Sequence, residues 1–206
     1  MNSAEETKAC CAAAYGNDAV ALVLGQSYHP GGLSLTRRLA ERLGSRSGHR
    51  VLDVAAGPGA TARLLAVDYD VVVDGVDLGE ATVEKAWAAT AEAGLTAKAR
   101  FRVGDAEQVR SPDATFDAVV CEYSGLLAGA GLRTVHTEHH DDALAGVIDQ
   151  IEARIRLLRM TAFTRLTEVG VDVDAVLHYC AAAKQAVADG LIGYALLVAE
   201  KLRRSP

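Results

Sequence analysis

The sequence has few aromatic residues, prolines and cysteines, and it has no long apolar run. Phe, Trp and Tyr make up 5% of the 206 residues, so we expect a core built mainly from Ala, Val and Leu. The longest apolar run covers residues 191–199 and contains Gly193, whereas a bilayer-spanning helix needs about 20 apolar residues. Four cysteines are too few for a disulfide scaffold. We therefore expect a reduced, cytoplasmic protein with no membrane partner.

The sequence also lacks an excess of basic residues. Its formal net charge is −6 and its pI is near 5.5. A protein that binds a phosphate backbone needs a basic face, so nucleic acid is not an expected partner. Residues 1–8 are polar and contain two glutamates, which does not fit a secretory signal peptide. With 50% hydrophobic and 23% charged residues, the chain has the composition of a globular protein.

Strand patterns and helix patterns alternate along the first part of the chain. Short apolar runs predict strands over residues 50–56, 71–77, 99–103 and 116–122. Amphipathic or Ala-rich segments predict helices over 33–43, 60–66 and 80–93, with Gly44 and Gly94 as C-terminal caps. This alternation predicts an α/β fold with right-handed crossovers, a Rossmann-like, mostly parallel sheet and helices on both faces.

The rest of the chain has a different pattern. Residues 132–137 are a candidate strand, 172–188 predict a long helix and 191–200 predict a closing antiparallel strand. Another helix is predicted by apolar residues that share one face, Leu144, Val147, Ile148, Ile151, Ile155 and Leu158. The neighbouring Arg154, Arg156 and Arg159 suit a solvated face.

We see no repeat and no clear linker, so residues 1–206 are interpreted as one domain. Residues 1–32 would form an N-terminal segment, 33–123 the core and 124–206 a shortened C-terminal part.

Acidic residues and glycines follow each predicted parallel strand. An open parallel sheet binds ligands beyond the carboxyl ends of its strands. There the sequence places Asp53, Gly57 and Gly59, then Asp77-Leu78, then Gly104-Asp105-Ala106, and finally Glu122-Tyr123. Asp77 lies 18 residues after Gly59, close to the spacing at which an acid reaches a ribose hydroxyl.

Two classes of nucleotide cofactor fit this pattern. A Gly-x-Gly turn followed by Ala62 satisfies the fingerprint of a dinucleotide-binding fold. Asp53 and Asp105 have no role in that fingerprint. Asp53 would instead meet a cation, and Asp105 would meet an exocyclic amine, which are the needs of S-adenosylmethionine.

In combination, these segments resemble the successive motifs of class I S-adenosylmethionine-dependent methyltransferases. The resemblance runs from about residue 30 to 123 and rests on residues 51–59, 76–78, 104–107 and 116–121. It implies that Asp53, Ala55, Gly57 and Gly59 form a loop on the methionine side of the cofactor. Ala55 stands where the family more often has glycine. The remaining implied contacts are Asp77 to the ribose hydroxyls, Leu78 to adenine, Gly104, Asp105 and Ala106 to the adenine amino group, and Glu122 to the methyl-transfer region.

The segment before the first predicted helix is similar to the UbiE/arsenite-methyltransferase-like group. In that group an N-terminal segment closes over the cofactor, which would make Tyr28 and His29 lid residues. The alternative is a Pro-Gly turn, Pro30-Gly31, that leads into the helix.

Cysteine and histidine clusters suggest two further sites. Cys10, Cys11 and Cys121 could form a thiol site for a metalloid, but buried, unreactive cysteines are the default interpretation, and Cys180 lies on an apolar helical stripe. Residues 136–142 hold three histidines without the two-histidine helical spacing of zinc sites, so no metal is predicted. Asp141 or Asp142 would cap the following helix. A catalytic-base role for one of these histidines stays open.

The chain departs from the family after the fourth strand. Only residues 123–131 separate Glu122 from the next candidate strand, and a parallel crossover usually takes a dozen or more residues. We infer that one β-α unit, including the fifth strand, is missing. The closing strands must then pair with the fourth strand or leave its edge exposed, and an exposed edge predicts a homodimer.

The sequence therefore predicts transfer of a methyl group from S-adenosylmethionine to a small-molecule acceptor. A base is needed only if the acceptor loses a proton, and Glu122, His29 and Tyr123 are the candidates. One alternative is a cofactor-binding protein that has lost catalysis with its fifth strand. A weaker alternative is an NAD(P)-dependent oxidoreductase.

Overall fold

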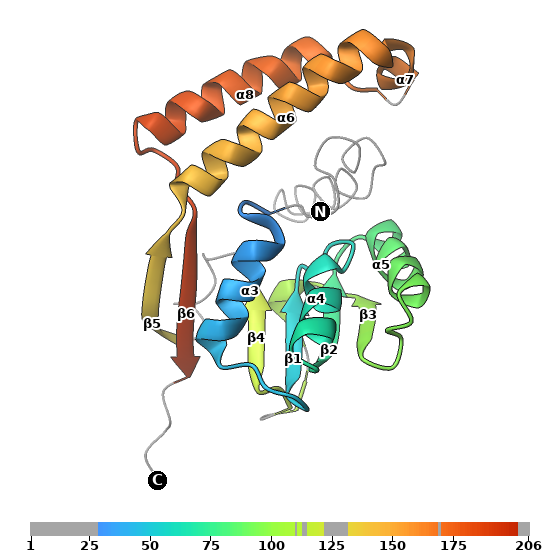
Figure 1. Ribbon diagram of the computed structural model, residues 1–206, viewed down its shortest axis with the longest axis vertical. Coiled ribbons are helices and arrows are strands. Elements are labelled where there is room, and N and C mark those ends of the chain that lie inside the picture. Colours follow the sequence, from blue (N-terminus) through green and yellow to red (C-terminus); the bar gives the residue numbers. More distant parts are fainter. Residues whose placement is uncertain (1–28, 110, 113–114, 122–131, 169, 202–206) are drawn as a thin grey trace. The chain divides into compact units, whose positions relative to one another are not determined.

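The computed structural model describes residues 29–109, 111–112, 115–121, 132–168 and 170–201 (Figure 1). Their contacts form two compact units. The first contains, among the described residues, 33–136 and 197–201, and the second contains 29–32 and 137–196. That the whole chain is one domain stays a prediction.

The first unit is built on a four-stranded parallel sheet. Its strands follow the order β3-β2-β1-β4, and every neighbouring pair is parallel. The strands are β1 (Arg50–Val54), β2 (Val72–Asp77), β3 (Ala99–Val103) and β4 (Ala118–Cys121). The helices are α3 (Gly32–Leu43), α4 (Ala60–Asp68) and α5 (Glu80–Glu92), with the short helix η1 (Ala106–Gln108) after β3. These elements confirm the predicted α/β fold, and their ends lie within two residues of the predicted ones.

Glycines end two of the helices as the sequence predicts. Gly44 after α3 and Gly94 after α5 have φ angles of 64° and 70°, in the left-handed region that glycine adopts without strain. The next residue in each case bonds back to the helix, Ser45 N–H to the Ala40 carbonyl and Leu95 N–H to the Thr90 carbonyl. These bonds satisfy carbonyls that the last helical turn would otherwise leave unpaired.

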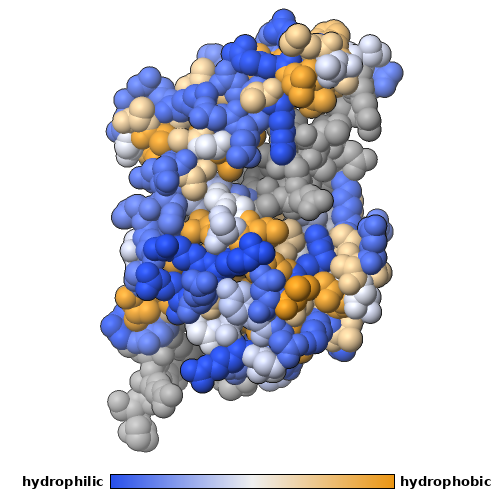
Figure 2. All heavy atoms as spheres, in the orientation of Figure 1, coloured by the Kyte–Doolittle hydropathy of each residue, from blue (hydrophilic) through white to orange (hydrophobic). Residues whose placement is uncertain are grey.

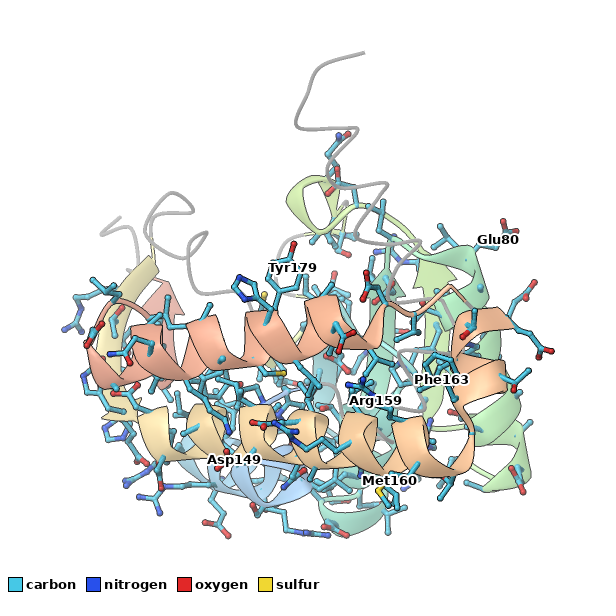
Figure 3. All side chains as sticks on the ribbon, turned by 90° about the horizontal axis from the view of Figure 1, so that it is seen from above. Glu80, Asp149, Arg159, Met160, Phe163 and Tyr179 are labelled. Carbon is cyan, nitrogen blue, oxygen red and sulfur yellow. The ribbon has the colours of Figure 1, made fainter. Side chains whose placement is uncertain are left out.

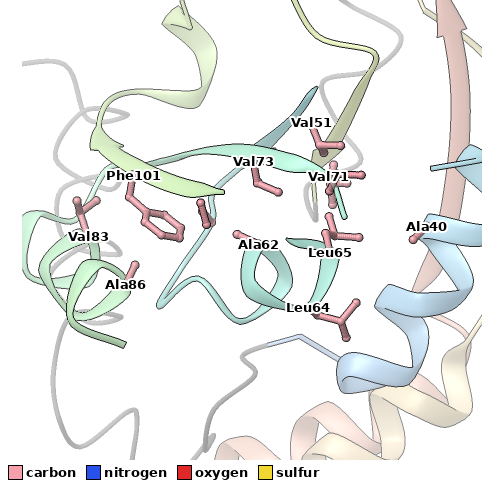
Figure 4. Packing of buried hydrophobic residues seen from close by; sticks show 13 residues of the cluster. Ala40, Val51, Ala62, Leu64, Leu65, Val71, Val73, Val83, Ala86 and Phe101 are labelled. Atoms are coloured by element: carbon pink, nitrogen blue, oxygen red, sulfur yellow. The ribbon is translucent and has the colours of Figure 1, made fainter. Parts of the chain in front are cut away.

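A hydrophobic core lies on one face of the sheet (Figure 4). Val51, Val73 and Phe101 of the strands pack there with residues of all three helices, including Ala40, Ala62, Leu65 and Ala86. The register places Asp53, Gly75 and Phe101 in one row across β1, β2 and β3 on this same face. Leu52, Val54 and Val76 form a smaller cluster on the opposite face. Helices on that opposite face stay a prediction.

Strand β4 forms one edge of the parallel sheet. The closing strands, β5 (Leu132–His139) and β6 (Ala195–Lys201), pair with each other in a separate two-stranded sheet and run antiparallel (Figure 1). Of the two arrangements that the sequence allowed, direct pairing with the fourth strand is therefore wrong. Within the described residues, no strand pairs with the second edge of β4. The missing β-α unit itself stays a prediction.

The second unit contains three helices, α6 (Asp141–Thr161), α7 (Phe163–Glu168) and α8 (Val173–Ala188). Figure 3 shows α6 and α8 side by side. Ile155, Leu166 and Val173 are buried together at one end of the unit. Of the predicted apolar face of α6, Ile148 and Ile155 are buried. No helix among the described residues is long and apolar enough to cross a membrane.

Two predictions for this unit need correction, and one helix was not predicted. The closing strand begins at Ala195 and not at residue 191, because Leu191 and Ile192 N–H groups bond back to the Ala186 carbonyl as an extension of the end of α8. Neither Asp141 nor Asp142 caps α6, because the N-cap residue is His140 and both acids lie in the first helical turn; Asp141 Oδ1 instead accepts from Tyr194 N–H at 2.8 Å. The helix α7 was not predicted from the sequence.

Exposed hydrophobic residues are scattered over the surface in view. Figure 2 shows them in small separate groups among hydrophilic residues. Among the described residues, Met160 is the most exposed large hydrophobic residue, at 85%. Scattered apolar residues of this kind are normal in globular proteins and do not by themselves mark a binding surface.

Candidate functional site

The predicted site residues of the first three strands meet at the carboxyl-terminal end of the parallel sheet. Asp53 lies on β1, Asp77 ends β2 and Gly104 directly follows β3. Because these strands are parallel neighbours, their carboxyl ends lie together at that end of the sheet. Gly104 N–H donates to the Asp77 carbonyl at 2.9 Å, which ties the end of β3 to the end of β2. The structure therefore brings these residues together as the sequence predicts.

The glycine loop, residues 55–59 between β1 and α4, has an unusual backbone. Ala55, Gly57 and Gly59 have φ angles of 57°, 55° and 77°. This region suits Gly57 and Gly59, but it brings the Cβ of Ala55 close to a carbonyl oxygen. Ala55, which stands where the family more often has glycine, therefore has a backbone conformation that glycine adopts without strain.

Asp77 is held by backbone groups on both sides. Its Oδ2 accepts from Gly57 N–H at 2.9 Å, and its Oδ1 accepts from Gly79 N–H at 2.9 Å. The first bond joins β2 to the glycine loop, and the second joins it to the start of α5. Each carboxylate oxygen has a second lone pair that can accept from a hydroxyl group. The carboxylate is thus fixed in position with acceptor capacity remaining.

The other predicted residues at this end of the sheet differ in exposure. Asp53 is 2% exposed, so its carboxylate lies beneath the loop and not at the surface. Leu78, next to Asp77, is 39% exposed, which leaves an apolar side chain at the sheet edge. Gly104, Asp105 and Ala106 are half-buried at the start of η1.

Several predicted site residues cannot be placed. Tyr28, Glu122, Tyr123, Cys10 and Cys11 lie outside the described residues. His29 belongs to the second compact unit, and its Nδ1–H donates to the Pro30 carbonyl at 3.1 Å. Burial lowers the pKa of His29 despite that hydrogen bond. The imidazole is therefore neutral at pH 7, the form that a general base requires.

The other cysteines and histidines that the structure describes lie apart from these strand ends in the sequence. Cys180 is buried, as predicted, and burial raises the pKa of its thiol. Cys121, at the end of β4, is half-buried. His140 Nε2 lies 3.4 Å from a carboxylate oxygen of Glu138. The described part of the chain contains no group of three or more potential metal ligands.

Two residues at the loop were not predicted from the sequence. Arg63, in the first turn of α4, donates from Nη1 to the Pro58 carbonyl at 2.7 Å. Phe101, on β3, lies against Gly59 and Gly75. The Gly-Pro-Gly turn indicates a ligand loop, but nothing in the sequence shows which distant side chain supports it. The available signal for Phe101 was its rarity. It is one of three phenylalanines in the chain, and it lies on a strand between Asp77 and Asp105.

Comparison with known proteins finds methyltransferase relatives for part of the chain. A family model for a methyltransferase domain matches residues 51–147. The 27-O-demethylrifamycin SV methyltransferase of Amycolatopsis mediterranei is 39% identical over 85 residues, which cover 41% of this chain and 31% of that relative. These matches support a class I S-adenosylmethionine-dependent methyltransferase. The alignment spans less than a third of that relative's length, and membership of the UbiE/arsenite-methyltransferase-like group stays a prediction.

Solved structures show the same fold for this chain. The cyclopropane synthase MmaA2 from Mycobacterium tuberculosis matches with a TM-score of 0.74 and 14% identity, over 89% of this chain and 94% of that one. A Haemonchus contortus phosphoethanolamine N-methyltransferase, bound to phosphomonomethylethanolamine and S-adenosylhomocysteine, matches with a TM-score of 0.71 and 17% identity. That match covers 90% of this chain and 56% of the other. At these identities the likeness establishes the fold.

Proposed function

We propose that this chain binds S-adenosylmethionine at the carboxyl ends of β1, β2 and β3 and transfers its methyl group to a small-molecule acceptor. The observation that carries the proposal is the Asp77 carboxylate, which backbone N–H groups of Gly57 and Gly79 hold at the sheet edge. The family match and the similar structure bound to S-adenosylhomocysteine support the same cofactor.

The residues at the carboxyl ends of the strands match the chemical groups of S-adenosylmethionine. The remaining lone pairs of Asp77 would accept hydrogen bonds from the two ribose hydroxyls. The exposed Leu78 would lie against adenine, and Gly104, Asp105 and Ala106 would lie near its amino group. Gly57 and Gly59 would follow the methionine part, with Ala55 at the start of the loop. Asp53 would act from beneath the loop, where a buried negative charge favours a nearby ammonium or sulfonium group.

The chemistry requires mainly correct placement. The cofactor supplies a methyl group on a sulfonium, which an acceptor attacks in line. Holding two reactants in a near-attack geometry lowers the barrier without a catalytic side chain. If the acceptor must lose a proton, the neutral imidazole of His29 is a candidate base, and Glu122 and Tyr123 remain the other candidates from the sequence.

Replacing Asp77 tests the cofactor site. We expect Asp77→Ala to weaken binding of S-adenosylmethionine and S-adenosylhomocysteine at least about tenfold, because hydrogen bonds to a charged group contribute about 1.5–3 kcal/mol. Isothermal titration calorimetry measures the loss. Asp74→Ala is the matched control, since Asp74 lies on the same strand and pairs with Arg50 at 2.8 Å. Unchanged affinity in Asp77→Ala, or no binding to the wild type, would contradict the proposal. Parallel titration with NAD tests the oxidoreductase alternative.

A second candidate function is cofactor binding without ordinary methyl transfer. The edge of β4, which no strand among the described residues covers, favours keeping this candidate. A product screen with thiol, arsenite and phenol acceptors distinguishes the two functions once binding is established. Methylated product supports the enzyme, whereas tight binding with no product over all three classes supports the second candidate.

We also propose a homodimer and a cytoplasmic location. The dimer is supported by the edge position of β4 and by the exposed Val119 in that strand. The location is supported by the low cysteine content, and fractionation of the producing cells tests it.

A further inference from the structure

The glycine loop needs support from the rest of the first unit. Three of its five residues have left-handed backbone conformations, and that of Ala55, a non-glycine residue, persists only where the surroundings impose it. Two contacts come from β2, Ala56 N–H to the Val76 carbonyl at 3.1 Å and Gly57 N–H to Asp77. These contacts hold the first half of the loop. In the second half, Gly59 N–H donates to the Ala56 carbonyl and the Gly59 carbonyl accepts from Arg63 N–H, both at 3.0 Å, so the Pro58 carbonyl is the group that needs a side-chain donor.

Phe101 holds the second half from the sheet side. A Cβ atom on Gly59 would lie 2.6 Å from Phe101 Cζ, and one on Gly75 would lie 2.5 Å from Phe101 Cδ1. The ring therefore lies directly against the two bare Cα atoms. Trp87 fixes Phe101 in turn, because its Nε1–H donates to the Phe101 carbonyl at 3.0 Å and the two rings make an edge contact. In Figure 4, Phe101 lies between α5 and the start of α4.

Arg63 holds the second half of the loop from the helix side. Its Nη1 donates to the Pro58 carbonyl at 2.7 Å and lies 3.1 Å from where a Cβ of Gly59 would be. Within the described part of the chain, the Pro58 carbonyl is the acceptor of this guanidinium. Burial lowers the pKa of Arg63, although the group stays charged at neutral pH. A partly desolvated cation makes a stronger hydrogen bond than a neutral donor.

We infer that Arg63 is a positioning residue of the cofactor site, which fixes the Pro58 carbonyl and the Gly59 backbone against the Phe101 ring. The effect of Arg63 on cofactor affinity rests on the proposed function. Its effect on the loop backbone does not. Because α4 holds the Pro58 carbonyl, the loop already has its ligand-binding backbone conformation before the ligand binds. Preorganisation of this kind raises affinity because binding no longer has to order the loop.

The test compares Arg63→Ala, Arg63→Lys and the control Arg46→Ala. Arg46 is exposed in the turn before β1, at the amino end of the sheet and therefore away from the loop. Hydrogen exchange in the ligand-free protein measures the loop amides of Gly57 and Gly59. Calorimetry then measures affinity for S-adenosylmethionine and S-adenosylhomocysteine.

We expect loop exchange in Arg63→Ala to be at least about tenfold faster and affinity for both ligands about tenfold weaker, the effect of one charge-assisted hydrogen bond. Arg63→Lys should recover part of both losses, and Arg46→Ala should change neither. Unchanged loop exchange in Arg63→Ala overturns the inference, even if affinity falls, because a direct ligand contact would then explain the loss. Faster exchange throughout the unit overturns it as well, since the role would be general stability. If the wild type binds neither ligand, the proposed function fails, while the exchange measurement still decides the role of Arg63.

Discussion

Ala55 is a strained residue at the start of the cofactor loop. A non-glycine residue at a φ angle of 57° costs about 1–2 kcal/mol, because its Cβ approaches a carbonyl oxygen. The side chain is exposed, so packing of the methyl group does not offset the cost. The left-handed conformation suits glycine, which the family more often has at this position.

We expect Ala55→Gly to stabilise the protein by about 1 kcal/mol. Relief of the strain exceeds the added backbone entropy of glycine in the unfolded chain, about 0.4–1 kcal/mol. Urea unfolding at equilibrium measures the change. The control is Ala88→Gly, on the exposed side of α5, which should destabilise by about 1 kcal/mol. A loss of stability in Ala55→Gly would show that the methyl group makes a favourable contact.

The strand-end residues could be predicted from the sequence, whereas their supports could not. Asp53, Asp77 and Asp105 follow apolar runs, and topology alone then places them at one edge of the sheet. Arg63 and Phe101 act through contacts with residues near Gly59, and Phe101 lies 42 positions away in the chain. The Phe101 contact depends on how β3 packs. The Arg63 contact is only five positions from Pro58, but it depends on the turn that leads into α4 and not on the residue pattern.

At the scale of elements, strong local signals gave the right helices and strands. Gly44 and Gly94 mark helix ends because only a left-handed residue closes them easily. The six-residue α7 carries no such signal, and Leu166 within it is buried by tertiary packing. The start of β6 was predicted too early because the apolar residues 191–192 continue the pattern, although the chain there is still turning away from α8.

Helices α6 and α8 are joined by a charged group at their surface. Glu152 on α6 accepts from Arg156 Nε at 2.9 Å and from Lys184 Nζ of α8 at 2.5 Å. Lys184 also pairs with Asp149 at 2.6 Å. Hydrogen bonds from Lys184 and then Arg156 lower the pKa of Glu152. Asp149 is labelled on α6 in Figure 3.

We expect Glu152→Gln to lower the melting temperature at pH 7 and to have no effect at about pH 2. A carboxyl group with a depressed pKa in the folded state stabilises the fold above its unfolded pKa, about 4.3, and loses this effect as pH falls through the folded value. Thermal unfolding followed by circular dichroism over this pH range gives the comparison. Glu84→Gln, on an exposed position of α5, should leave the melting temperature unchanged. An equal drop for Glu152→Gln at both pH values would point to lost packing and not to lost charge.

For the whole molecule, the open edge of β4 predicts self-association. Light scattering should give a mass of about 43 kDa, twice the chain mass of 21.6 kDa. Val119→Glu should reduce it to that of one chain, because a charge on an edge strand opposes pairing with another edge. Val67→Glu, on the exposed side of α4, is the control. A single-chain mass for the wild type at high concentration would contradict the dimer.

The order of β5 and β6 along the chain affects how the protein forms during synthesis. Residues 140–194, which include all of α6, α7 and α8, separate the two paired strands. At about 5–20 residues per second, β6 is made roughly 3–11 s after β5. During that interval β5 lacks its described partner, whereas β1 to β4 have already been made. Slow synthesis should therefore favour capture of nascent chains by chaperones at β5, and pulse proteolysis of stalled chains can detect that stage.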